Sequence, residues 1–276
     1  MNSVNPNYEI KPDSSLEKML DISDQLKNDI DVKRPIEGDL WKTIEEKLLV
    51  EWTYNSNAIE GSTLSFGETL FFLKNGLTVE GKPFKDFIDA KNHAEAIDFL
   101  YDVINKRRGI TTSLVKEFNA FLLSGIKSTP AVDRVGNRIE KKATPGEYKL
   151  LPNHVLQSDG LIYEYVDPLQ VPSEMEFLCN WINENIDNLH PIIVAAVAHY
   201  NMVRIHPFDD GNGRGARILM NLILIEKGFP PTIIKNQSRR KYIEALSEAD
   251  RGNLNKFIEF IAESCIDTQN SILENL

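Results

Sequence analysis

Apolar residues recur at three- and four-residue spacing along most of this chain, and no other feature constrains its fold as strongly. Such spacing lines one face of an α-helix, and that face has to pack against another element. The expected fold class is therefore mainly α, and we assign no element to residues 1–39. The predicted helices cover Asp39–Tyr54, Leu64–Lys74, Phe84–Asn105, Ser113–Leu123, Glu174–Ile186, Pro191–Arg204, Arg214–Glu226, Lys241–Glu248 and Leu254–Leu273.

One stretch, from Arg134 to Pro172, departs from the helical period. Two turn signals, Pro145-Gly146 and Ser158-Asp159-Gly160, flank short apolar and aromatic runs there. Runs of this kind between turn residues are typical of a β-hairpin. We expect one hairpin in this stretch, with Lys141-Lys142 solvated in the loop before it.

Composition limits where the protein works and what it binds. With 276 residues, 42% of them hydrophobic, the chain can bury one large core or two modest ones. A net charge of −10 argues against sequence-independent binding to nucleic acid. The first residues resemble no secretory signal, and the longest apolar run, Pro191 to Val203, is too short to span a bilayer. Cys179 and Cys265 have no metal-site spacing, so we expect free buried thiols in a reducing compartment, the cytoplasm. We expect no membrane partner.

The segment His206-Pro207-Phe208-Asp209-Asp210-Gly211-Asn212-Gly213-Arg214-Gly215-Ala216-Arg217 combines the groups that phosphoryl or nucleotidyl transfer requires. Its glycines can turn successive N–H groups toward one point, where the positive end of a helix dipole also begins. Arg214 and Arg217 lie three residues apart, so they share a helical face and can hold phosphate oxygens. The segment therefore predicts a site for a phosphate chain.

The same segment resembles the signature of the Fic (Fido) family, His-x-Phe-x-Asp/Glu-Gly-Asn-Gly-Arg-x-x-Arg, and meets it at every fixed position. The resemblance implies a helical bundle with a β-hairpin flap over the active site. It also implies a protein adenylyltransferase, which moves AMP from ATP to a Ser, Thr or Tyr hydroxyl of a target protein. The expected partners are that target and ATP, with a homodimer left open.

Roles for individual residues follow from the resemblance. His206 would be the general base, and an imidazole suits that role because it titrates near neutrality. Asp210, rather than Asp209, would bind Mg²⁺, for which one carboxylate plus substrate phosphates suffices. The resemblance puts Arg214 on the β-phosphate and Arg217 on the γ-phosphate, and Phe208 in the core as an anchor. The nucleotide-binding stretch is Asp210, Gly211, Asn212, Gly213, Arg214, Gly215, Ala216 and Arg217.

A second motif, Ser56-Asn57-Ala58-Ile59-Glu60-Gly61, resembles the family's inhibitory signature. Ser56 and Glu60 are four residues apart and share one helical face. The resemblance implies that Glu60 pairs with Arg217 and takes the place of the γ-phosphate. It would also put the protein in the class whose inhibitory helix, here about residues 54–61, precedes the catalytic core.

Other assignments from the resemblance are less direct. Tyr242 matches a base-stacking tyrosine of the family, and Asp250 stands where the family has an asparagine. Asp accepts but cannot donate hydrogen bonds, so the choice of purine stays open. His154, Val155 and Leu156 are expected in the flap. The expected division is an N-terminal helical region over 1–110, a catalytic core over 111–262 and a helical tail over 263–276.

Three alternatives to AMP transfer stay open. The same residues could remove AMP from a modified protein, with Glu60 orienting water. Phosphate transfer is disfavoured by Gly213, where the relatives that transfer phosphate carry Lys. A nucleotide-sensing protein without catalysis is disfavoured by His206, which binding alone does not require.

Overall fold

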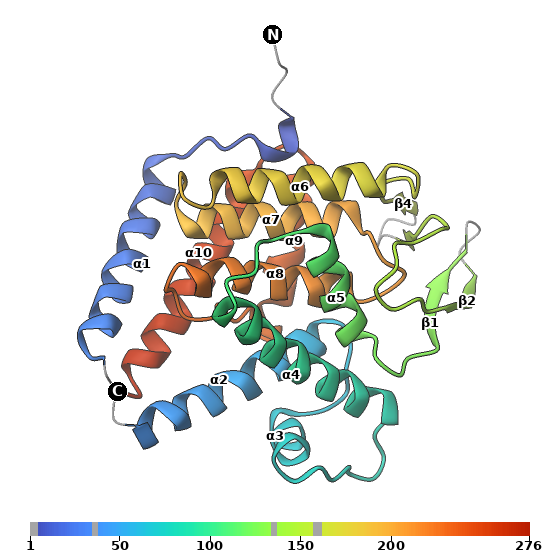
Figure 1. The fold of residues 1–276 in the computed structure, drawn as a ribbon, viewed down its shortest axis with the longest axis horizontal. Helices are drawn as coiled ribbons and strands as arrows, with labels where there is room; N and C mark the ends of the chain where they lie inside the picture. Colours follow the sequence, from blue (N-terminus) through green and yellow to red (C-terminus); the bar gives the residue numbers. More distant parts are fainter. Residues whose placement is uncertain (1–4, 35–37, 134–136, 157–161) are drawn as a thin grey trace.

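The computed structural model describes residues 5–34, 38–133, 137–156 and 162–276, and within these ranges the fold is mainly α, as the sequence predicted (Figure 1). Two short 3₁₀ helices, Pro6–Tyr8 and Asn236–Ser238, precede α1 and α9. The α-helices are α1 (Ser14–Val32), α2 (Gly38–Ile59), α3 (Phe66–Asn75), α4 (Phe84–Asn105), α5 (Thr112–Leu122), α6 (Val171–Asn185), α7 (Pro191–Ile205), α8 (Asn212–Glu226), α9 (Arg239–Asp250) and α10 (Leu254–Leu273).

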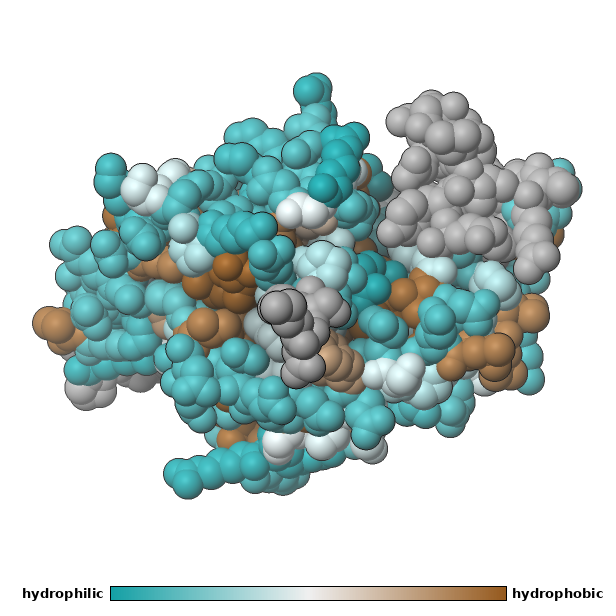
Figure 2. Space-filling view, turned by 90° about the horizontal axis from the view of Figure 1, so that it is seen from above, coloured by the Kyte–Doolittle hydropathy of each residue, from teal (hydrophilic) through white to brown (hydrophobic). Residues whose placement is uncertain are grey.

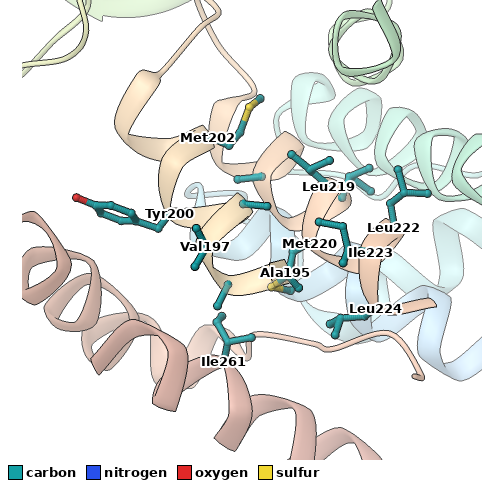
Figure 3. Packing of buried hydrophobic residues seen from close by; sticks show 14 of the residues in the cluster. Ala195, Val197, Tyr200, Met202, Leu219, Met220, Leu222, Ile223, Leu224 and Ile261 are labelled. Carbon is teal, nitrogen blue, oxygen red and sulfur yellow. The ribbon is translucent and has the colours of Figure 1, made fainter. Parts of the chain in front are cut away.

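Helix α8 forms the centre of the bundle, with α2, α4, α5 and α7 packed around it (Figure 1). Every residue from Arg214 to Leu224 is buried. A helix that is enclosed on all sides can be apolar around its whole circumference, as the second half of α8 is. Figure 3 shows Leu219, Met220 and Ile223 of α8 close to Ala195 and Val197 of α7. The start of α8 is thereby held rigidly from several directions.

Helix α1 was not predicted, so leaving residues 1–39 without an element was wrong. The Asp13 side chain caps it by accepting hydrogen bonds from the N–H groups of Ser15 and Leu16. It then packs along α10. A buried Ser23 interrupts its apolar stripe and donates to Gln269 of α10 at 2.9 Å. Because a polar residue takes a core position, the stripe is hard to read from the sequence.

The hairpin predicted between Arg134 and Pro172 is confirmed, but a second antiparallel pair, which begins before that stretch, was not predicted. Strands β1 (Ser128–Val132) and β2 (Arg138–Lys142) form one antiparallel pair, and β3 (His154–Leu156) and β4 (Ile162–Glu164) form another. Lys141-Lys142 therefore lies in β2 and not in a loop. Both pairs lie on the side of the molecule opposite α1 (Figure 1).

The surface is mostly polar. The face in Figure 2 is largely hydrophilic, with hydrophobic residues in small separate areas. Cys179 and Cys265 are free and buried, as predicted. No helix in the described part of the chain has the length and hydrophobicity needed to cross a bilayer.

Candidate functional site

The loop between α7 and α8 carries His206 in an unusual backbone conformation. Helix α7 ends at Ile205, and His206 adopts the left-handed region with φ 50° and ψ 59°. Phe208 is buried, as expected of an apolar anchor. The Asn212 side chain accepts from the Phe208 N–H and donates to its carbonyl, both at 2.9 Å. These contacts fix the loop between the imidazole and the start of α8.

Helix α8 begins with amides that no side chain caps. Gly211, at its N-cap, has φ 78°, a conformation that a glycine adopts without strain. It supplies no side-chain hydrogen bond to the first turn. The first N–H groups of a helix attract anions, and the helix dipole favours negative charge at this end. This turn can therefore receive a phosphate or a carboxylate.

Arg217 is held by the motif in α2. Its guanidinium donates to the Ser56 hydroxyl at 2.9 Å and to the Ser56 carbonyl at 2.9 Å. It also pairs with the Glu60 carboxylate at 2.7 Å. Arg217 is almost fully buried, whereas the Glu60 side chain is 43% exposed. The two sequence motifs, 157 residues apart at this pair, thus meet in one place.

Glu60 lies directly against the first turn of α8. A β-carbon built on Gly213 would come within 2.2 Å of Glu60 Oε1, so only glycine is compatible with this contact. Partial desolvation against the start of α8 opposes ionisation of Glu60, but the positive charge of Arg217 beside it, helped by Arg214, leaves its pKa below the ordinary value. The carboxylate is therefore an anion at neutral pH, placed at an anion-binding turn.

Arg214 forms a second buried ion pair, which the sequence did not predict. Its Nη1 lies 2.7 Å from Asp89 Oδ1 of α4, and its Nη2 lies 3.7 Å from Asp210 Oδ1. Lys85 pairs with the other oxygen of Asp89 at 2.6 Å. Asp89 lies 125 residues before Arg214, and no motif in the sequence connects the two.

The imidazole of His206 is neutral and stacked. It lies parallel to the Tyr165 ring, with centroids 3.8 Å apart and an interplanar angle of 15°. Burial, together with the nearby positive charge of Lys149, lowers the pKa of His206 to about 3. Its Nδ1 has no hydrogen-bond partner within the described ranges. The imidazole is neutral and can accept a proton, as a general base must, but its lowered pKa makes it a weaker base than the near-neutral imidazole expected from the sequence.

The two neighbouring aspartates have different surroundings. Asp209 is buried and pairs with Lys141 of β2 at 2.6 Å, and it accepts a hydrogen bond from the Thr144 hydroxyl. Lys141 is therefore paired and not solvated as predicted. Asp210 is 31% exposed, and its Oδ1 accepts from the Gly211 N–H at 2.6 Å.

The described residues contain no group of three or more His, Cys, Asp or Glu side chains that could hold a metal by itself. Mg²⁺ does not need such a group, because it is commonly bound by one or two carboxylates together with substrate phosphates. The partly exposed carboxylate of Asp210, close to an anion-binding helix start, fits that kind of site.

Residues outside the motifs tie the active loop to the hairpins. Asn119 of α5 donates to the Asp210 carbonyl at 2.9 Å and accepts from the Gly146 N–H at 3.0 Å. Asn153, next to β3, donates to the Phe208 carbonyl at 2.8 Å. Such contacts between distant segments had no signal in the sequence.

Tyr242 faces inward, whereas Asp250 is exposed. Tyr242 is buried, and its hydroxyl lies 2.9 Å from His199 Nε2. Asp250 accepts from the Tyr200 hydroxyl at 3.2 Å. Their roles at an adenine base stay predictions, as does the flap role of His154, Val155 and Leu156, whose backbone forms β3.

A helical bundle with this motif at the start of its central helix defines a Fic-domain protein. Residues 109–224 match the model of the Fic/DOC family, and the chain belongs to that family. It is 30% identical over 260 residues to a protein adenylyltransferase Fic of Nematostella vectensis, which covers 90% of this chain and 56% of the relative. A protein of the same name from Aedes aegypti is 33% identical over 230 residues, or 80% of this chain and 41% of the relative. The chain thus spans about half the length of these relatives.

Solved structures give the same family. A Fic domain-containing signaling protein from Bacteroides thetaiotaomicron has a TM-score of 0.78 and 29% identity, covering 95% of this chain and 96% of the other. Fic-1 of C. elegans, residues 134–508, also has a TM-score of 0.78, with 26% identity, and covers 94% of this chain and 72% of the other.

Proposed function

We propose that this protein transfers AMP from ATP to a hydroxyl side chain of a target protein. The observation that carries the proposal is the single site formed by a neutral His206, an uncapped helix start and two buried arginines. The similarity to proteins named protein adenylyltransferase supports it.

In this reaction His206 takes the proton from the target hydroxyl, whose oxygen then attacks the α-phosphorus of ATP. A new P–O bond forms, the bond to the β-phosphate oxygen breaks, and pyrophosphate leaves. The N–H groups of α8 and the guanidiniums of Arg214 and Arg217 would hold the phosphates. Charge stabilisation by such fixed donors is often the largest contribution to catalysis.

Mg²⁺ is the proposed cofactor, with Asp210 as its protein ligand. The ion would neutralise phosphate charge and orient the leaving group. Arg214 and the Gly211 N–H fix the position of the Asp210 carboxylate. The remaining carboxylate oxygen, Oδ2, has no hydrogen bond within the described residues, so it can bind a cation.

Glu60 is proposed as an inhibitor within the same chain. Its carboxylate contacts the start of α8 and pairs with Arg217, which would otherwise hold the γ-phosphate. ATP would then bind in an unproductive arrangement until Glu60 moves away. The contacts with Ser56 would hold Arg217 in place both before and after Glu60 moves away.

Removal of AMP from a modified protein is the second candidate. It is favoured by the partial exposure of the Glu60 carboxylate, which leaves an oxygen accessible to a water molecule. This reaction would use the same Asp210 and Asn212.

Mass spectrometry tests the proposal. The wild type, Glu60→Gly and the double variant Glu60→Gly/His206→Ala are each incubated with Mg²⁺ and ATP. We expect Glu60→Gly to gain the mass of one or more AMP groups, and the double variant to gain none. A gain of phosphate instead would contradict nucleotidyl transfer. Adduct formation at the same rate without His206 would show that His206 is not the base.

The target protein, a homodimer and a cytoplasmic location are further proposals from the sequence. Light scattering would measure the oligomeric state, and cell fractionation the location.

A further inference from the structure

Lys149 is a buried lysine next to the catalytic loop, although it belongs to neither motif. It lies between the two hairpins and is 1% exposed. Lysine is almost never fully buried unless it has a specific partner. Within the described residues, no carboxylate lies at ion-pair distance from Lys149. Its position therefore needs another explanation.

The hydrogen bonds of Lys149 lie on both sides of His206. Its backbone N–H donates to the Pro207 carbonyl at 2.8 Å. Its Nζ donates to the Ile205 carbonyl at 3.3 Å. One residue thus holds the carbonyls immediately before and after the catalytic histidine.

His206 needs such support because of its backbone. A non-glycine residue at φ 50° has an unfavourable conformation that persists only where the surroundings hold it. The two hydrogen bonds from Lys149 act on both neighbours of this residue.

Lys149 also lies near the aromatic ring that packs on the imidazole. Its Nζ is 5.8 Å from the centroid of the Tyr165 ring, within the range of a cation–π contact. The same ring stacks on the His206 imidazole, with the ring centroids 3.8 Å apart. The side chain of Lys149 thus reaches both the backbone of the loop and the ring that orients the base.

We propose that Lys149 is a positioning residue for the catalytic base: it holds the loop on both sides of His206 and, with Tyr165, fixes the orientation of the imidazole. The proposal rests on the proposed role of His206 in transfer.

The charges around His206 agree with this placement. Burial, Lys149 and Lys141 lower its pKa, whereas Glu60 and a hydrogen bond with the Val203 backbone raise it. The pKa of Lys149 is itself lowered to about 8 by burial and by the positive charge of Lys141. The negative charges of Asp167 and Asp209 oppose this shift. Removing the Lys149 charge should therefore raise the pKa of His206 toward its ordinary value.

The test compares Lys149→Met with Lys91→Met, both in the full chain that carries Glu60→Gly. Methionine fills a similar apolar volume but removes the Nζ donor and the charge, while the backbone N–H that donates to Pro207 is kept. Lys91 is a suitable control, because its side chain is 58% exposed and pairs with Glu95 on the surface.

Two measurements are made on each chain. The first is NMR of the His206 imidazole at neutral pH, where the chain is folded, with the signal assigned by its loss in His206→Gln; it needs no transfer activity. We expect shifted imidazole resonances in Lys149→Met only. The second is self-modification with ATP, where kcat should fall about tenfold or more while KM for ATP stays within about twofold.

Unchanged imidazole resonances in a folded Lys149→Met chain would overturn the proposal. A loss confined to KM for ATP would also overturn it, because Lys149 would then serve the nucleotide. If Lys149→Met does not fold, Lys149→Leu takes its place, and unchanged resonances there would have the same meaning. Altered resonances in a parent chain that transfers no AMP would support the positioning role and contradict the proposed function.

Discussion

At the scale of single residues, Glu60 approaches the start of α8 at the one position in the first turn, Gly213, where a β-carbon would collide with its carboxylate. The absent β-carbon of Gly213 is what allows the carboxylate to reach the start of α8. If the Glu60 carboxylate occupies the place of an ATP phosphate, a side chain at residue 213 would exclude the carboxylate and the phosphate alike. The requirement for glycine can therefore be tested separately from the inhibition.

We predict that Gly213→Ala, made in the Glu60→Gly chain, weakens ATP binding by about tenfold or more, or about 1.4 kcal/mol. The reason is that the new methyl group would lie within 2.2 Å of the atom position that Glu60 Oε1 occupies. Calorimetric titration with ATP and Mg²⁺ measures the change.

Gly215→Ala is the matched control. A β-carbon there meets nothing closer than Met202 Cε at 3.5 Å, which is an ordinary contact. Its ATP affinity should stay within about twofold of the parent. If Gly213→Ala also bound ATP as tightly as the parent, the ATP phosphates would not occupy the place that the Glu60 carboxylate has in the wild type.

The resemblance of the two motifs to a known family predicted that Glu60 would pair with Arg217, and the structure has this pair. Asp89 and Asn119 had no such signal, and the contacts of Lys149 with the loop could not be predicted either. Each reaches the loop only because α4, α5 or the hairpin segment packs against it. Contacts of this kind depend on the tertiary fold and leave no local pattern.

At the scale of elements, α1 and the first hairpin show where the pattern fails. In α1 a buried Ser23 stands in the apolar stripe, and Gln269 satisfies it from α10. In the hairpin, β1 contains Pro130 and β2 reads Arg-Ile-Glu-Lys-Lys, so neither resembles a typical strand. These two segments form strands because they pair with each other, and their amino-acid composition alone does not predict it.

The packing of α1 leads to a prediction about stability. Leu16 has 0% exposure and belongs to the main core. Leu16→Ala should lower the free energy of unfolding by about 2–5 kcal/mol, because it removes buried methyl groups and leaves a cavity. Urea denaturation measures this quantity.

Ile22→Ala serves as the control on the same helix, since Ile22 is 48% exposed. Its effect should stay within about 0.5 kcal/mol. Equal, small effects at both positions would mean that α1 is not part of the folded core.

At the scale of the whole molecule, one hydrophobic core runs from Tyr8 to Ile272 and encloses titratable groups. His93 and His199 have 0% exposure. Burial and the positive charge of Arg217 lower the pKa of both well below the ordinary value of a histidine. Folding therefore holds both imidazoles neutral under conditions in which the unfolded chain takes up protons.

This predicts that the protein loses stability in mild acid. Below about pH 6.5 the unfolded chain binds more protons than the folded one, and the cost per histidine rises toward about 1.4 kcal/mol per pH unit as the unfolded imidazole becomes fully protonated. Between about pH 6.5 and pH 5.5 each imidazole that folding keeps neutral costs about 1 kcal/mol. His93 and His199 together should therefore remove about 2 kcal/mol, and His206, which folding also keeps neutral, about 1 kcal/mol more. Urea denaturation across this range measures the slope, and His93→Gln should reduce it by about a third. A stability that is level, or rises toward acid, would contradict the buried neutral state.

The central claim is that His206 drives AMP transfer from ATP while Glu60 blocks it, and labelled ATP tests both parts at once. Wild type, Glu60→Gly and Glu60→Gly/His206→Ala are incubated with Mg²⁺ and ATP labelled at either the α- or the γ-phosphorus, and label bound to protein is counted. The account predicts α-label on Glu60→Gly at about tenfold or more above the wild type, little on the double variant, and γ-label on none. Label from the γ position, or equal α-label on wild type and Glu60→Gly, would contradict it.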